Sequence, residues 1–133
     1  MEYRIIKNAS YTGFSRIGTL LASYNQLVEL FGRSGDRHWM ISTPGHRFAI
    51  WLYNEKVKDK DEILAWSIAG HGNGYEVDQC RKVTGLPCLT PPDYYQFREK
   101  YGWGDLSEAF ENIKGLNYPQ LISKIYEDAE VLN

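Results

Sequence analysis

The stretch ILAWSIAGHGNGYE, residues 63–76, predicts a strand, a turn and the start of a helix in direct succession. Residues 63–70 carry apolar side chains on both alternating sets of positions, so either both faces of this strand are covered or one face is a binding surface. Gly72-Asn73-Gly74 is typical of a turn that requires a positive φ at one of its glycines. We expect residues 75–83 to form a helix that ends at Gly85.

Two β-rich segments precede this strand and indicate a hairpin. HWMIST (38–43) and RFAIWLYN (47–54) flank a Pro-Gly turn signal. EYRIIKN (2–8) adds a short strand, and the charged run KVKDKDE (56–62) is typical of a loop. The order of these segments predicts a small antiparallel sheet of three or four strands.

A helical period of apolar side chains runs from Ile17 to Phe31. Ser23 and Gln26 form a capping-box pattern within it. The helix is therefore expected to begin either at Ile17 or at Ser23, with the earlier residues as a lead-in. Gly32 is the expected stop.

The C-terminal third of the chain is predicted to be helical. Residues 87–92 form a turn-rich connection, and Asp93 is expected to cap the helix DYYQFREKYGW. Asp105 is the expected cap of a second helix, which ends at Gly115. Asn117 is the expected cap of a last helix, with a proline in its first turn.

The composition is that of an ordinary globular domain: 133 residues, 43% hydrophobic and 24% charged. We expect a single α+β domain, residues 1–133, with a small antiparallel sheet, one helix in the N-terminal half, and residues 87–133 as a helical extension packed on it. Aromatic residues make up 14% of the chain. Because one core of this size struggles to bury so many rings, some are expected on a binding surface.

The charge of the chain narrows the classes of partner that it is expected to bind. The net charge is −2, which gives no overall basic field for nucleic acid or for an anionic membrane. Residues 104–133 hold six acids and two bases, so this end either faces a basic partner or presents solvated helix faces. The sequence has no signal-peptide pattern and no apolar run of about twenty residues. We therefore expect a protein of the cytoplasm with no membrane partner.

No metal site or cofactor is predicted. Cys80 and Cys88 lack the paired spacing of zinc ligands and are expected to be reduced thiols. Asp59, Asp61 and Glu62 alternate with lysines, as in a solvated loop. The glycines around His71 match neither a Walker nor a Rossmann spacing.

The histidines offer one catalytic hypothesis. His46 starts the second hairpin strand and His71 follows the strand 63–70. Antiparallel pairing could bring both to one sheet edge, where Arg47 would complete a general acid–base site for phosphodiester cleavage. The spacing is not diagnostic, and structural or exposed histidines are the other interpretation. No catalytic residue is therefore assigned.

A ligand-binding hypothesis rests on the aromatic residues. Trp39, Trp51, Tyr53 and Trp66 share one sheet face if the hairpin register allows, where they would stack on a nucleobase. The other interpretation places these rings in the core. The candidate ligand-binding residues are Arg47, Trp51, Trp66, His71, Asn73 and Tyr75.

GTLLASYNQLVELFG (18–32), an aromatic hairpin and AWSIAGH (65–71) together resemble a group of small proteins encoded by tailed bacteriophages. The resemblance covers about residues 18–84, and the segment from Pro87 onward does not match. The group carries no established enzyme activity, so the resemblance implies no catalytic residue. It implies a small phage protein that disables a host factor or sequesters a host signalling molecule.

These observations lead to three functional hypotheses. The first is a non-enzymatic phage-encoded protein of the host cytoplasm that inhibits a host protein or sequesters a nucleotide-like signal. The second is a small phosphodiester-cleaving enzyme that uses His46 and His71. The third is a homo-oligomeric assembly protein.

Overall fold

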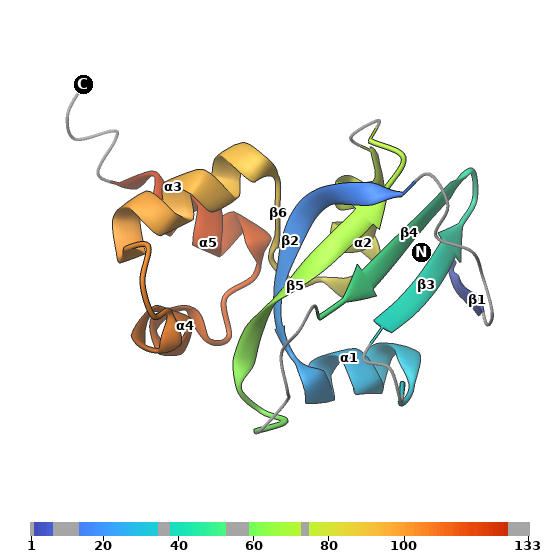
Figure 1. Cartoon of the computed structure of the whole chain (residues 1–133), viewed down its shortest axis with the longest axis horizontal. Coiled ribbons are helices and arrows are strands. Elements are labelled where there is room, and N and C mark those ends of the chain that lie inside the picture. The colour runs from blue at the N-terminus through green and yellow to red at the C-terminus, as the bar shows by residue number, and fades with distance from the viewer. Residues whose placement is uncertain (1, 7–13, 35–37, 53–58, 73–74, 128–133) are drawn as a thin grey trace.

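The computed structural model of the protein describes residues 2–6, 14–34, 38–52, 59–72 and 75–127. Over these ranges the chain is α+β, with one six-stranded antiparallel sheet and five helices (Figure 1). The predicted α+β class is confirmed, whereas the sheet has six strands where three or four were predicted. The elements in chain order are β1 (Arg4–Ile6), β2 (Ser15–Ser23), α1 (Tyr24–Phe31), β3 (His38–Thr43), β4 (His46–Trp51), β5 (Ile63–Gly70), α2 (Tyr75–Thr84), β6 (Cys88–Leu89), α3 (Pro91–Tyr101), α4 (Ser107–Ile113) and α5 (Tyr118–Ile125).

The strands lie in the order β1-β3-β4-β5-β2-β6. The predicted hairpin is confirmed as β3 and β4, and Gly45 in its turn adopts a φ of +82°. The predicted third strand is confirmed as β5, which pairs with β4 on one side and with β2 on the other. An interior strand of this kind is covered on both faces, which explains its apolar side chains at both sets of alternating positions.

The strand β2 occupies the region where a helix from Ile17 was one of the two expectations. Leu20 lies opposite Trp66 in the β2–β5 register, and both side chains are fully buried. This long-range pairing overrides the local helical spacing. The other expectation is nearer to the structure, because Ser23 is the N-cap of α1. Its hydroxyl accepts the N–H of Gln26 at 3.1 Å, and the Gln26 side chain accepts the N–H of Ser23 at 2.8 Å.

The short strand β6 occupies part of segment 87–92, which the sequence predicts as a turn-rich connection. Cys88 pairs with Leu20 and Leu89 pairs with Thr19, so β6 extends the sheet beyond β2. Both β6 side chains are fully buried. Because α3 begins directly after β6, its first turns lie beside β2 (Figure 1).

Two of the three C-terminal helices begin at residues other than the predicted caps. Thr90, not Asp93, caps α3: its hydroxyl accepts the Asp93 N–H at 3.3 Å. Two prolines at the first helical positions suit this earlier start. Helix α4 begins at Ser107, and Asp105 accepts its N–H from outside the helix at 2.9 Å. The predicted cap of α5, Asn117, is confirmed.

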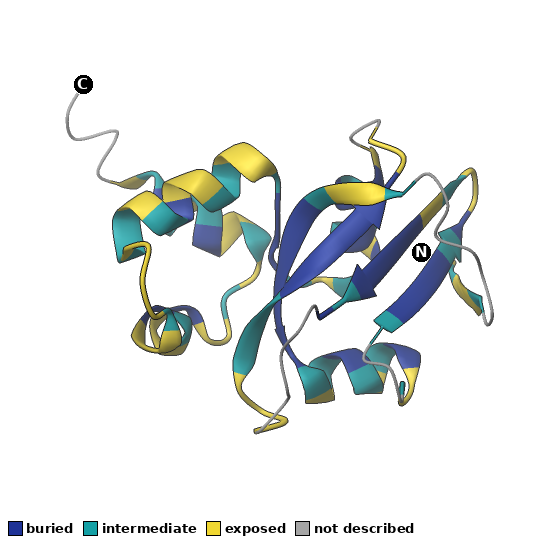
Figure 2. Cartoon of the chain, in the orientation of Figure 1, coloured by how far each residue is buried: buried dark blue, intermediate teal, exposed yellow. Residues whose placement is uncertain are grey.

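The two faces of the sheet carry different helices. On one face Trp39 and Trp66 pack with residues of α1 and α2. On the other face Leu21 and Leu89 pack with α3, α4 and α5. Figure 2 shows the strands as the buried centre, with exposed positions along the outward sides of the C-terminal helices. None of the helices in the described ranges is long and apolar enough to cross a membrane.

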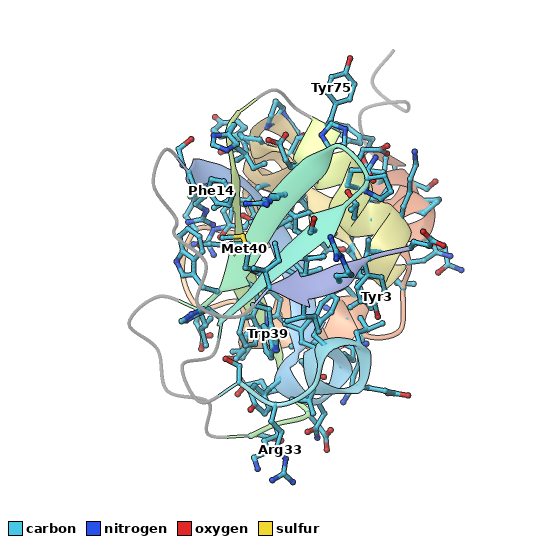
Figure 3. All side chains as sticks on the ribbon, turned by 90° about the vertical axis from the view of Figure 1, so that its right-hand side faces the viewer. Tyr3, Phe14, Arg33, Trp39, Met40 and Tyr75 are labelled. Atoms are coloured by element: carbon cyan, nitrogen blue, oxygen red, sulfur yellow. The ribbon has the colours of Figure 1, made fainter. Side chains whose placement is uncertain are left out.

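A third cluster consists of Met40, Ala49 and Ala69, with Ile6, Phe14 and Trp51 packed against them. Because strand side chains alternate, this cluster lies on the same face of the sheet as Leu21. Phe14 belongs to this side of the sheet, whereas Tyr3 packs toward α1 on the other side (Figure 3).

Candidate ligand-binding site

The structure places Trp66 in the core. Its side chain is fully buried, and its Nε1 donates to the backbone carbonyl of Ala22 at 2.8 Å. Trp39 packs beside it with ring centroids 5.7 Å apart and donates to the carbonyl of Gly32 at 2.9 Å. Because both indoles are enclosed and hydrogen-bonded, neither presents a ring face to a ligand.

The hairpin register separates the tryptophans that the ligand-binding hypothesis grouped on one face. Trp39 lies opposite Ile50, and His38 lies opposite Trp51. Trp51 therefore points to the sheet face opposite Trp39 and Trp66. Tyr53, predicted on the aromatic face, and Asn73, a candidate ligand-binding residue, lie outside the described residues.

The register also separates the two histidines of the catalytic hypothesis. Ala49 lies opposite Ala69, so continuing the ladder brings Arg47 level with His71 and leaves His46 facing the other side. The His71 ring contacts Phe14 edge-on at 4.7 Å, whereas the His46 ring lies 5.7 Å from that of Tyr75. Tyr75 projects from one end of the molecule (Figure 3). Each histidine ring therefore contacts a different aromatic residue.

The glycine turn after β5 is organised around a buried carboxylate. Glu76 is only 2% exposed, and its Oε1 accepts the backbone N–H of His71 at 2.9 Å. A Cβ at position 70 would lie 2.8 Å from this carboxylate, so Gly70 makes the close approach possible. Gly72 has a φ of +89°, which confirms the predicted turn geometry. The His71 N–H at this turn is therefore already bound by a carboxylate.

A cleft of about 330 Å³, which we call the aromatic cleft, lies between β2 and the start of α3. Tyr95 and Trp103 are 52% and 56% exposed, and their rings meet in a T-shaped contact at 5.5 Å. Exposed rings that gather around a hollow are a recognised feature of binding surfaces. The lining residues are Arg16, Gly18, Thr19, Pro91, Tyr94, Tyr95 and Trp103.

The sequence predicted exposed rings but not their location. The sequence predicts Tyr94 and Trp103 in one helix and places Arg16 outside the predicted helices and strands. The surplus of aromatic residues was the one signal in the sequence that pointed to exposed rings. Composition does not show that β6 brings the residues near 16 and 94 together.

Side chains near the end of α3 hold Trp103 in place. Its Nε1 donates to the Glu99 carboxylate at 2.8 Å, and the Arg98 guanidinium lies 5.4 Å from its ring centroid. Arg98 also donates to the carbonyl groups of Trp103 and Gly104. The indole is therefore oriented before any ligand arrives.

Arg16 is the charged residue among the described residues that line the cleft. Its guanidinium donates to the Thr19 hydroxyl at 2.8 Å and lies 5.9 Å from the Tyr94 ring centroid. The β2–β5 register shifts between Arg16 and Gly18, and a bulge of this kind re-aims a neighbouring side chain. The cleft thus combines apolar rings with one cation.

A cluster centred on Asp93 supports the cleft wall formed by α3. The hydroxyls of Tyr118 and Tyr126 each donate to the Asp93 carboxylate at 3.1 Å. The Arg81 guanidinium lies 3.6 Å from this carboxylate and 3.7 Å from the centre of the Tyr118 ring. Burial raises the pKa of both tyrosines, and Asp93 raises it further, whereas Arg81 lowers that of Tyr118. We call these four residues the Asp93 cluster; it joins α2, α3 and α5.

A larger open cleft of about 750 Å³ lies between the start of β1 and the β3–β4 turn. Its lining includes charges of both signs, Glu2 and Arg4, and the polar side chains of Ser42 and Thr43. The hydroxyl of its single aromatic residue, Tyr3, donates to the carbonyl of Leu30 at 2.9 Å. This cleft therefore provides less ring surface than the aromatic cleft.

The two cysteines lie in the core, away from both clefts. Cys80 and Cys88 are fully buried free thiols, and burial raises the pKa of Cys80 well above its usual value. In the part of the chain that the structure describes, no three histidine, cysteine or acidic side chains gather as metal ligands would.

Comparison with known proteins identifies no relative: no family model, no curated protein and no solved structure matches the chain. The resemblance to proteins of tailed bacteriophages therefore stays a prediction.

Proposed function

We propose that the protein is a non-enzymatic binding protein that captures a small ligand in the aromatic cleft. The observation that carries this proposal is the pair of half-exposed rings, Tyr95 and Trp103, beside the Arg16 guanidinium. Exposing two large rings side by side costs free energy in water, and a ligand that covers them recovers it.

The preorganisation of the cleft supports this proposal. Trp103 is already held by Glu99 and Arg98, and Tyr94 stacks on the buried ring of Phe97 with centroids 6.3 Å apart. Ligand binding therefore immobilises few additional side chains, which lowers its entropic cost. The volume lies at the small end of the range typical of ligand pockets.

The lining favours binding over catalysis. The described residues that line the cleft include no carboxylate, histidine or cysteine. The hydroxyl of Thr19 accepts a hydrogen bond from Arg16, an arrangement without the neighbouring base that an activated nucleophile needs. Ring stacking and one guanidinium suit recognition without bond cleavage.

The host-directed role in this proposal comes from the resemblance to phage proteins. A protein that sequesters a host signalling molecule needs a pocket and no catalytic groups, and the aromatic cleft meets that requirement. Inhibition of a host protein through the acidic C-terminal end remains an alternative prediction.

Native mass spectrometry of the protein purified from a bacterial lysate tests the proposal. We expect the wild-type protein to retain a small molecule, and Trp103→Ala to release it. Ile5→Ala, which removes an exposed apolar side chain at the β1 edge, is the matched control and should retain it. The proposal fails if nothing is retained, or if Tyr75→Ala releases the molecule and Trp103→Ala does not.

A further inference from the structure

We infer that Arg16 makes the aromatic cleft selective for a planar ring that carries an anionic group, with a nucleoside monophosphate as its chemical model. This inference rests on the proposed function. It adds the chemical class of the ligand and assigns Arg16 the specificity-determining role.

The bonding of Arg16 differs from that of the other arginines around α3. Arg81 lies 3.6 Å from the Asp93 carboxylate, and Arg98 donates to two backbone carbonyl groups. Among the described residues, the partner of Arg16 is the neutral hydroxyl of Thr19, and no carboxylate pairs with it. A guanidinium has five N–H donors, so Arg16 can bind Thr19 and still face an anion with two parallel hydrogen bonds.

The position of Arg16 fits a ligand with two parts. The guanidinium lies 5.9 Å from the Tyr94 ring centroid, within the same cleft as Trp103. A planar ring can stack on the aromatic wall while an attached phosphate reaches the cation. A cationic ligand is disfavoured, because it would meet Arg16 inside the aromatic wall.

The size and charge of the cleft favour a free small molecule over a nucleic-acid strand. A volume of about 330 Å³ accommodates one ring system and its substituent. Proteins that bind single strands line a longer groove with several cations that follow the backbone. Here the described lining contains one cation, Arg16.

Tryptophan-fluorescence titration with purified ligands tests the inference. The probes are nucleoside monophosphates of all four bases, the matching nucleosides and inorganic phosphate. We expect a monophosphate to bind roughly tenfold or more tightly than its nucleoside, as one charge-assisted contact would produce. Arg16→Gln should remove that difference while stacking of the nucleoside remains. Arg16→Lys should restore part of it, because the charge returns without the planar fork.

Arg33→Gln is the matched control, because Arg33 is exposed beyond the end of α1 (Figure 3) and does not line the cleft. Circular dichroism melting confirms that each variant is folded. Equal binding of nucleoside and monophosphate, or an unchanged preference in Arg16→Gln, overturns the inference. If no probe binds while lysate-derived protein still retains a molecule that Trp103→Ala releases, this inference fails and the proposed function stands.

Discussion

The buried carboxylate of Glu76 accepts the backbone N–H of His71 at 2.9 Å and thereby links the end of β5 to the first turn of α2. Its Oε2 has no hydrogen-bond partner among the described residues. Burying an oxygen without a hydrogen-bond partner costs free energy, so the rest of the fold must offset that cost. The glycines here suggest an anion site, but the contact between Glu76 and His71 has a structural role, and we call it the Glu76 clamp.

Removing this clamp should destabilise the fold. We expect Glu76→Ala to lower the free energy of unfolding by about 2 kcal/mol, because the His71 N–H loses its partner. Gly70→Ala should cost at least as much in the wild-type chain, where the new methyl group would meet the carboxylate at 2.8 Å. Urea denaturation of both single variants and the double variant measures the coupling. Strictly additive effects would contradict the clamp.

Truncation of Trp66 should cost much more stability than truncation of Trp103. Trp66→Ala should destabilise the protein by about 4 kcal/mol, because it leaves a cavity beside α1 and α2. Trp103→Ala removes a ring that is 56% exposed and should change stability by less than about 1 kcal/mol. Thermal melting compares the two. A large loss of stability in Trp103→Ala would indicate that its ring is structural.

The Asp93 cluster should stabilise the packing of α3 against α2 and α5. Asp93→Ala removes the acceptor of two tyrosine hydroxyls and the ion-pair partner of Arg81, and we expect a loss of about 2 kcal/mol. Asp78→Ala is the control: it breaks a surface pair with Lys82 at 3.1 Å and should cost less than about 0.5 kcal/mol. Similar midpoints of denaturation for the two variants would argue against the cluster.

The tyrosines of this cluster predict a loss of stability in alkali. Their pKa values are raised in the folded protein, so the unfolded chain releases these protons at lower pH. The stabilisation is present below the ordinary tyrosine pKa of about 10 and decreases as the pH rises through that value. Urea denaturation from neutral pH to about pH 11 should show the decline. Tyr118→Phe and Tyr126→Phe should flatten it, and an unchanged slope in both would contradict the prediction.

Glu99 should act by positioning Trp103. Glu99→Ala removes the acceptor of the indole N–H and should weaken ligand binding several-fold with little change in stability. Glu99→Gln retains an acceptor oxygen and should recover most of the affinity. Fluorescence anisotropy of the indole checks the cause, since a freed Trp103 should reorient faster. Unchanged ligand binding in Glu99→Ala would show that the orientation of Trp103 does not contribute to recognition.

Local signals predicted many of the elements, and long-range pairing explains the differences. The hairpin turn, the Ser23 capping box and the Asn117 cap depend on neighbours a few residues away. The spacing of Ile17 and Leu20 by itself favours a helix. Only the pairing of β2 with β5, more than forty residues later, selects the strand.

The candidate site also depends on long-range pairing that local signals do not show. The predicted ligand-binding residues follow from the assumption that aromatic residues on neighbouring strands share a face. One register shift reverses every side chain of a strand, and the observed register places Trp51 and Trp66 on opposite faces. The aromatic cleft was not predicted, because Arg16 and Tyr94 lie far apart in the chain and meet through β6.

By itself the sequence determined the α+β class, the hairpin, the interior strand β5, the glycine turn and a surplus of rings beyond what the core holds. These features depend on composition, periodicity and turn chemistry, which act over a few residues. The tertiary structure decided which rings are buried and which surround Arg16. That outcome depends on strand order and register, and the free energy of those pairings comes from contacts between distant segments.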